Sequence, residues 1–157
     1  MSFQISALDT KEFSHLFHLN DEELASHGVQ RYRVTDKPGF PCRISLLDAE
    51  PGETVLLLNY LHLDTDTPYR ASHAIFVGEN STPANLAIDE IPDSIKIRLM
   101  SVRAFDEGGT MLDADVVEGS ELEPLLQAMF NNEAVAFIHL HNARRGCYAA
   151  RVERAAR

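Results

Sequence analysis

The chain has 157 residues, of which 45% are hydrophobic and 24% charged, and its formal net charge is −10. This length predicts one domain over residues 1–157, large enough to fold around an apolar core without a disulfide or a structural metal. The negative charge argues against nucleic-acid binding, because a polyanion would be repelled. No apolar run approaches the roughly 18 residues that cross a bilayer, so we expect no membrane partner.

The charge is distributed unevenly along the chain. Residues 1–133 carry 9 basic and 23 acidic groups, whereas residues 134–157 carry five arginines and one acid, Glu153. Arginine forms forked contacts with anions more readily than lysine does. The C-terminal segment is therefore the part of the chain most suited to attract an anion.

The N-terminus and the cysteines both bear on the cellular compartment. The first residues, MSFQISALDTKEF, contain no basic start, no apolar stretch and no small-residue cleavage site. They do not form a secretory signal, and a cytoplasmic location follows by default. Cys42 and Cys147 match neither a zinc spacing nor a redox pair, and we expect two free thiols.

Two short helices are predicted first along the chain. Asp9 and Glu12 have the spacing of a capping box, and Asn20 and Glu23 repeat that spacing. Gly28 is placed to end the second helix in a left-handed turn.

Strand-like segments follow these helices. Apolar patterning predicts strands over residues 29–35, 42–47, 54–61 and 72–77. The segment 54–61 (TVLLLNYL) is apolar on both faces, which predicts a central strand. Residues 99–105 and 110–117 flank an Asp-Glu-Gly-Gly turn and predict a β-hairpin.

The clearest helix is predicted over residues 120–130. Its apolar residues recur at helical spacing and should be buried: Leu122, Leu125, Leu126, Met129 and Phe130. Ser120 and Glu123 have the spacing of a third capping box. Strands over 135–141 and 147–153 then close the chain as a second hairpin. These elements predict an α+β fold with one mostly antiparallel sheet.

Four segments together resemble a known bacterial family. They are residues 37–43 (KPGFPCR), 53–58 (ETVLLL), 68–70 (PYR) and 141–151 (HNARRGCYAAR). The family is number twelve-hundred-and-three among the domains of unknown function, and the resemblance covers almost the whole chain. It implies a bacterial source and a stand-alone domain, and it transfers no catalytic roles. His73 departs from the family pattern, in which a smaller residue is expected.

Polar side chains gather at the predicted strand ends, where a rigid scaffold usually presents a site. They are Cys42, Arg43, His62, Tyr69, Arg70, His139, His141, Asn142, Arg145 and Cys147. Arginines combined with histidines and a tyrosine suit a carboxylate or a phosphate. We expect the pairs Cys42–Arg43, Tyr69–Arg70 and His139–Asn142 to meet at one edge of the sheet. The alternative interpretation is that these arginines form ion pairs with acidic residues on the protein surface.

Cys42 and His141 are the candidate catalytic residues. Cys42 follows a stiff Pro-Gly-Phe-Pro turn and precedes Arg43, whose positive charge favours a thiolate. With a histidine close in space, such a thiol would form a nucleophile–base pair. In the alternative, Cys42 is a small buried hydrophobic residue.

Two histidines suggest a metal site only weakly. His139 and His141 lie two apart on a predicted strand and share one face, and His62 or His73 could supply a third ligand. The next residues are arginines rather than a glutamate, which disfavours a dication. We therefore expect structural histidines, with no metal and no cofactor. Asp113 and Asp115 share a strand face that we expect to be solvated.

Two functions of different classes follow. The first is a protein that binds or processes an anionic small molecule through the Arg, His, Tyr and Cys residues named above. The second is a non-catalytic module that binds a partner or forms a homo-oligomer, in which an acidic surface meets the arginine-bearing end of another copy. The residues do not decide whether the protein is an enzyme.

Overall fold

A computed structural model describes residues 1–156 of the chain, which fold into two compact units. Unit 1 comprises Met1–Ser6, Leu61–His73 and the chain from Leu86 onward. Unit 2 comprises Ala7–Tyr60 and Ala74–Asn85. Within the described residues, no helix is both long enough and apolar enough to cross a membrane.

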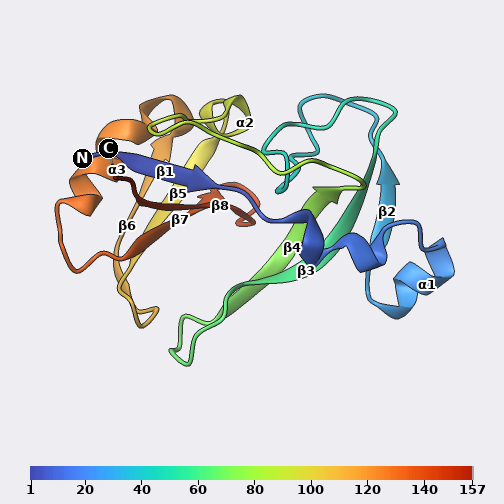
Figure 1. The fold of residues 1–157 in the computed structure, drawn as a ribbon, viewed down its shortest axis with the longest axis horizontal. Helices are drawn as coiled ribbons and strands as arrows, with labels where there is room; N and C mark the ends of the chain where they lie inside the picture. Colours follow the sequence, from blue (N-terminus) through green and yellow to red (C-terminus); the bar gives the residue numbers. More distant parts are fainter. Residues whose placement is uncertain (157) are drawn as a thin grey trace. The chain divides into compact units, whose positions relative to one another are not determined.

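Unit 1 contains a five-stranded antiparallel sheet in the order β1-β8-β7-β5-β6 (Figure 1). Its strands are β1 (Phe3–Ser6), β5 (Leu99–Phe105), β6 (Met111–Glu118), β7 (Phe137–Asn142) and β8 (Tyr148–Arg154). Both predicted hairpins are confirmed, because β5 pairs with β6 and β7 pairs with β8. The central strand β7 is buried except at its last residue. The edge strand β6 is mostly exposed, and Asp113 and Asp115 lie on it in solvent, as predicted.

The long predicted helix is present, but it begins later than its sequence pattern indicates. A 3₁₀ turn, η3 (Gly119–Glu121), precedes α3 (Leu122–Phe130). Ser120 lies inside that turn, so the predicted capping box is absent and Glu121 occupies the N-cap without a side-chain hydrogen bond. Pro124 is the third residue of α3, where a missing N–H leaves no intrahelical bond unmade. Four of the five predicted core residues of this helix are buried, and Leu125 is half-buried.

Unit 2 is built around the three-stranded sheet β2-β3-β4. Its elements are η1 (Thr10–Glu12), η2 (Ser14–Leu16), α1 (Asp21–Ser26), β2 (Gln30–Arg33), β3 (Thr54–Leu63) and β4 (Ala71–Gly78). β3 is the central strand, as its two apolar faces predict. The first predicted helix is only two 3₁₀ turns, whereas α1 has the complete Asn20–Glu23 capping box. The final residues of β3 and the first residues of β4 belong to unit 1.

The strand predicted over residues 42–47 is wrong. This segment forms a turn flanked by isolated bridges that pair Pro41 with Asp48 and Cys42 with Phe76. Leu46 has φ 55°, a left-handed conformation that no strand accommodates, and its N–H donates to the Cys42 carbonyl at 2.9 Å. The apolar side chains still serve a core, because Ile44 and Leu46 are buried.

The predicted α+β class with antiparallel pairing is confirmed, although the strands form two sheets rather than one. A further short helix, α2 (Asp93–Lys96), precedes β5 along the chain. It contacts the η3 turn, and the N–H of Gly119 donates to the Arg98 carbonyl at 2.8 Å.

Candidate metal centre

Strand β7 places two histidines on one face of the unit 1 sheet. Side chains alternate along a strand, so His139 and His141 point the same way. They are 2% and 1% exposed. In the β5–β7 register His139 lies opposite Arg103, and His141 lies opposite Ser101. These four residues therefore share one face of the sheet.

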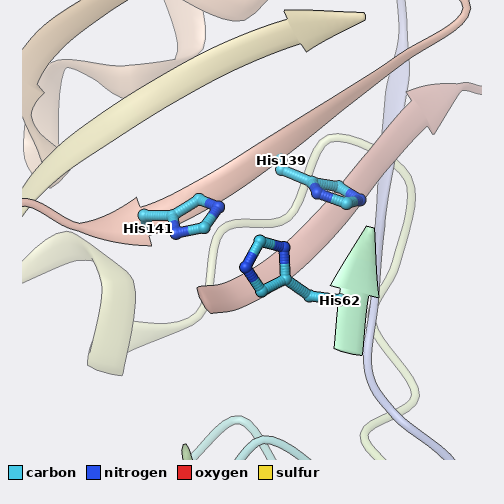
Figure 2. Close-up of side chains that lie close together, drawn as sticks. All are labelled: His62, His139 and His141. Atoms are coloured by element: carbon cyan, nitrogen blue, oxygen red, sulfur yellow. The ribbon is translucent and has the colours of Figure 1, made fainter. Parts of the chain in front are cut away.

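A third histidine reaches this face from β3. The His62 ring lies 4.8 Å from the His141 ring and 5.9 Å from the His139 ring, measured between centroids. One ring nitrogen from each histidine lies within 4.8 Å of the others. Figure 2 shows the three rings facing a common space between them. The sequence offers His62 and His73 as possible third ligands, and it is His62 whose ring nitrogen lies close to those of His139 and His141.

Hydrogen bonding determines which nitrogens are free. The Nδ1 of His141 lies 3.0 Å from the Gly146 carbonyl oxygen and must carry a proton to donate there. Its Nε2 is then left with an unprotonated lone pair, the arrangement typical of a metal-binding histidine. The Nδ1 atoms of His62 and His139 are buried and have no hydrogen-bond partner in the described part of the chain. Buried polar atoms without partners are rare and call for an explanation.

The site keeps the histidines neutral. Burial is the largest cause, and it lowers the pKa of His62 to about 4 and those of His139 and His141 to about 3. The positive charge of Arg103 lowers the pKa of all three histidines further. Neutral imidazole is the form that binds a metal ion.

Aromatic side chains surround the three rings. Tyr148 stacks on His62, with centroids 5.4 Å apart and planes 7° apart, and it also contacts His139 edge-on at 5.1 Å. Phe137 lies 5.1 Å from His139 and stacks on Phe105 at 5.3 Å. The histidines therefore lie among aromatic rings, and His139 and His141 are almost completely shielded from solvent.

Comparison with known proteins identifies the family. A family model described as "Protein of unknown function (DUF1203)" matches residues 39–154. The chain belongs to DUF1203. The match runs through both compact units. No curated protein and no solved structure matches this DUF1203 chain.

Other predicted site residues of the DUF1203 chain lie in unit 1 but outside the three rings. Tyr69 is 41% exposed and meets Phe105 edge-on, and Arg70 forms an exposed ion pair with Asp64. The Asn142 side chain donates to Cys147 Sγ at 3.5 Å, and Arg145 is exposed in the β7–β8 turn.

Cys42 and Arg43 belong to unit 2, and both are buried. Their predicted meeting with Tyr69–Arg70 and His139–Asn142 therefore stays a prediction. A terminal nitrogen of Arg43 donates to the Pro41 carbonyl at 2.5 Å. Burial raises the pKa of the Cys42 thiol, but hydrogen bonds bring it below its usual value. They involve the Ser45 side chain, the Ser45 and Gly78 N–H groups, which donate to the sulfur, and Ser81 Oγ, which lies 3.5 Å from it.

The two cysteines are free thiols, as predicted, and burial should protect both from reagents. We expect thiol titration to find two thiols in denaturant and no fast-reacting thiol in the native protein. The Cys42→Ser variant should leave one thiol in denaturant. A fast native thiol that disappears in Cys42→Ser would contradict the burial of Cys42.

Sequence reasoning missed Arg103, the charged residue on the same face as the histidines. The segment 99–105 was correctly predicted as a strand, and its alternation places Ser101, Arg103 and Phe105 on one face. Only the register of β5 against β7 shows that this face carries His139 and His141. That register cannot be read from the alternation alone.

Proposed function

We propose that this protein binds a divalent transition-metal ion, with zinc as the first candidate, through His62, His139 and His141. The observation that carries the proposal is the convergence of three ring nitrogens within 4.8 Å. Two of the three histidines also carry buried Nδ1 atoms without hydrogen-bond partners among the described residues. This proposal replaces the expectation of purely structural histidines.

The separations suit a metal centre after a small movement. Zinc–nitrogen bonds of about 2.0–2.1 Å in a tetrahedral site place ligand nitrogens roughly 3.3 Å apart. The largest separation here, 4.8 Å, requires the rings to close by roughly 1.5 Å at most. His62 is only half-buried and lies on a different strand from the other two, so it is the ring best able to move.

The donor set leaves a coordination position open. Among the described residues, no cysteine, aspartate or glutamate joins the three histidines. Three protein ligands with an open fourth position are typical of catalytic zinc sites, whereas structural sites carry four. Imidazole ligands also suit copper, iron, cobalt and nickel, so the donor atoms do not fix the metal. We propose a centre that accepts a small exogenous ligand.

Metal titration tests the proposal. We expect wild-type protein to bind one Co²⁺ or Zn²⁺ per chain, with the visible absorption of tetrahedral Co²⁺. Metal at about 100 times its dissociation constant should stabilise the fold by about 2.7 kcal/mol, which is a rise in melting temperature of roughly 5–10 °C.

Variants assign the binding to the three histidines. His62→Ala should weaken Co²⁺ binding by roughly 100-fold or more, since even an outer-shell change costs 10- to 100-fold. His27→Ala, which removes an exposed histidine of unit 2, is the matched control and should bind as wild type does. The absence of stoichiometric binding to wild type, or equal binding by His62→Ala, would refute the metal centre.

A bacterial source and a cytoplasmic location belong to the same proposal. The resemblance to a bacterial family supports the first, and two unpaired thiols are consistent with the second. The alternative of a partner-binding module or a homo-oligomer stays a prediction.

A further inference from the structure

Arg103 is half-buried and forms no ion pair with an acid among the described residues. Its Nε–H donates to Ser101 Oγ at 3.1 Å, and its two terminal nitrogens have no partner in the described part of the chain. Three other arginines form ion pairs: Arg31 with Glu79, Arg70 with Asp64 and Arg151 with Glu153. A guanidinium group has five N–H donors, so most donors of Arg103 are left for solvent or for a bound ligand.

Arg103 lies close enough to the histidines for its remaining N–H donors to reach a ligand bound there. Arg103 lies directly opposite His139 in the sheet, a pairing that places Cβ atoms about 4.5–5.5 Å apart. Ser101 holds its Nε, which leaves the terminal nitrogens for another group. The second arginine beside His139, Arg151, is engaged by Glu153 at 3.1 Å and lies 4.0 Å over the Phe137 ring.

We propose that the centre takes a small ligand with an anionic oxygen group, a carboxylate or an inorganic oxyanion, one of whose oxygens binds the metal while another accepts hydrogen bonds from Arg103. This inference rests on the proposed metal centre. A dication on three neutral histidines beside an arginine leaves like charges close together, and no carboxylate of the described residues joins the three histidines. An anionic ligand between the two cations removes that repulsion and forms charge-assisted hydrogen bonds.

The proposed anion binds Arg103 rather than the arginines that the sequence indicates. The sequence points to Arg43, Arg70 and Arg145, but Arg70 is paired with Asp64 and exposed. Arg103 combines partial burial, free donors and a place beside the histidines. An anion bound there is a direct ligand of the centre rather than a surface counter-ion.

The test is a titration of the Co²⁺-loaded protein with acetate, and separately with inorganic phosphate, followed by cobalt absorption and calorimetry. Acetate represents a carboxylate ligand and phosphate represents an inorganic oxyanion, so the one that binds more tightly identifies the ligand class. We expect one of them to bind wild type and, by reciprocal linkage, to raise its Co²⁺ affinity by the same factor. Arg103→Gln should lose roughly tenfold or more of this anion affinity, which corresponds to one charge-assisted hydrogen bond.

Three controls separate the possible failures. Arg103→Gln should bind Co²⁺ at least as tightly as wild type in the absence of anion, and it should bind neutral imidazole at the metal unchanged. Arg70→Gln should keep the wild-type anion affinity. Co²⁺ binding with an anion affinity independent of Arg103, or with no anion binding, overturns this inference alone. No Co²⁺ binding by wild type overturns the proposed metal centre and this inference with it.

Discussion

The metal-free protein should lose about 4 kcal/mol of unfolding free energy for each unit by which the pH falls near pH 5. Burial lowers the pKa of His62 to about 4 and the pKa values of His139 and His141 to about 3, whereas an unfolded histidine titrates near 6.5. Between these values the unfolded chain binds up to three more protons than the native protein. Each such proton changes the free energy by about 1.4 kcal/mol per pH unit.

The sign follows from these lowered pKa values. The contribution of these three histidines to stability is fully present well above pH 6.5, falls as the pH drops below that value, and stops changing near pH 3–4, where the native histidines also take up protons. Urea unfolding in chelator at several pH values between 4.5 and 7 measures this slope. His62→Gln is the control and should remove about a third of the slope. A wild-type slope equal to that of His62→Gln would show that His62 is not held neutral by the fold.

The second large effect is expected at Gly119. A Cβ at this position would lie 1.9 Å from the Ile95 carbonyl oxygen and 2.9 Å from the Arg98 carbonyl oxygen. Both atoms belong to the main chain, and the Arg98 carbonyl also accepts the Gly119 N–H, so neither can withdraw cheaply. We expect Gly119→Ala to lose about 3 kcal/mol or more, at or above the upper end of overpacking costs.

Gly108→Ala is the matched control for this substitution. Gly108 lies in the β5–β6 turn, and the nearest atom to its added Cβ would be Asp106 Oδ1 at 3.5 Å, an ordinary contact. We expect a change within about 1 kcal/mol, as for most surface substitutions. Urea unfolding at one pH compares the two variants, and a Gly119→Ala variant that fails to fold while Gly108→Ala folds supports the same conclusion. Equal stabilities would contradict the close packing of Gly119.

The sequence predicts elements well where one local signal dominates. The strand predicted over 99–105 matches β5 residue for residue, and the Asn20–Glu23 capping box starts α1. Prediction fails where the backbone departs from its local pattern. Residues 42–47 have the apolar content of a strand, but the left-handed Leu46 turns the chain. Ser120 has a capping-box spacing, but a 3₁₀ turn takes that position.

The candidate site could be predicted only in part, because some of its residues are brought together by long-range strand pairing rather than by a local pattern. The spacing of His139 and His141 shows that they share a face, because alternation is a local property of a strand. The third histidine comes from β3, about 80 residues earlier in the chain, and Arg103 reaches the site through the register of β5 against β7. Long-range pairing of this kind leaves no signature in one sequence, so the sequence offers His62 only as one of two possible third ligands and gives no sign that Arg103 belongs to the site.

The exposed edge strand β6 has a consequence for how copies of this protein meet. No strand of the described residues pairs with its outer side, and such an edge is the kind of template onto which another chain can anneal. The N–H groups of Ala114 and Val116 donate instead to the carboxylates of Asp113 and Asp115, each at 2.8 Å. An antiparallel copy of β6 added there would bring its own Asp113 and Asp115 against the same pair. Carboxylates so placed repel one another, and this repulsion disfavours the stacking of sheets into aggregates. We therefore expect Asp113 and Asp115 to disfavour edge-to-edge association of this protein.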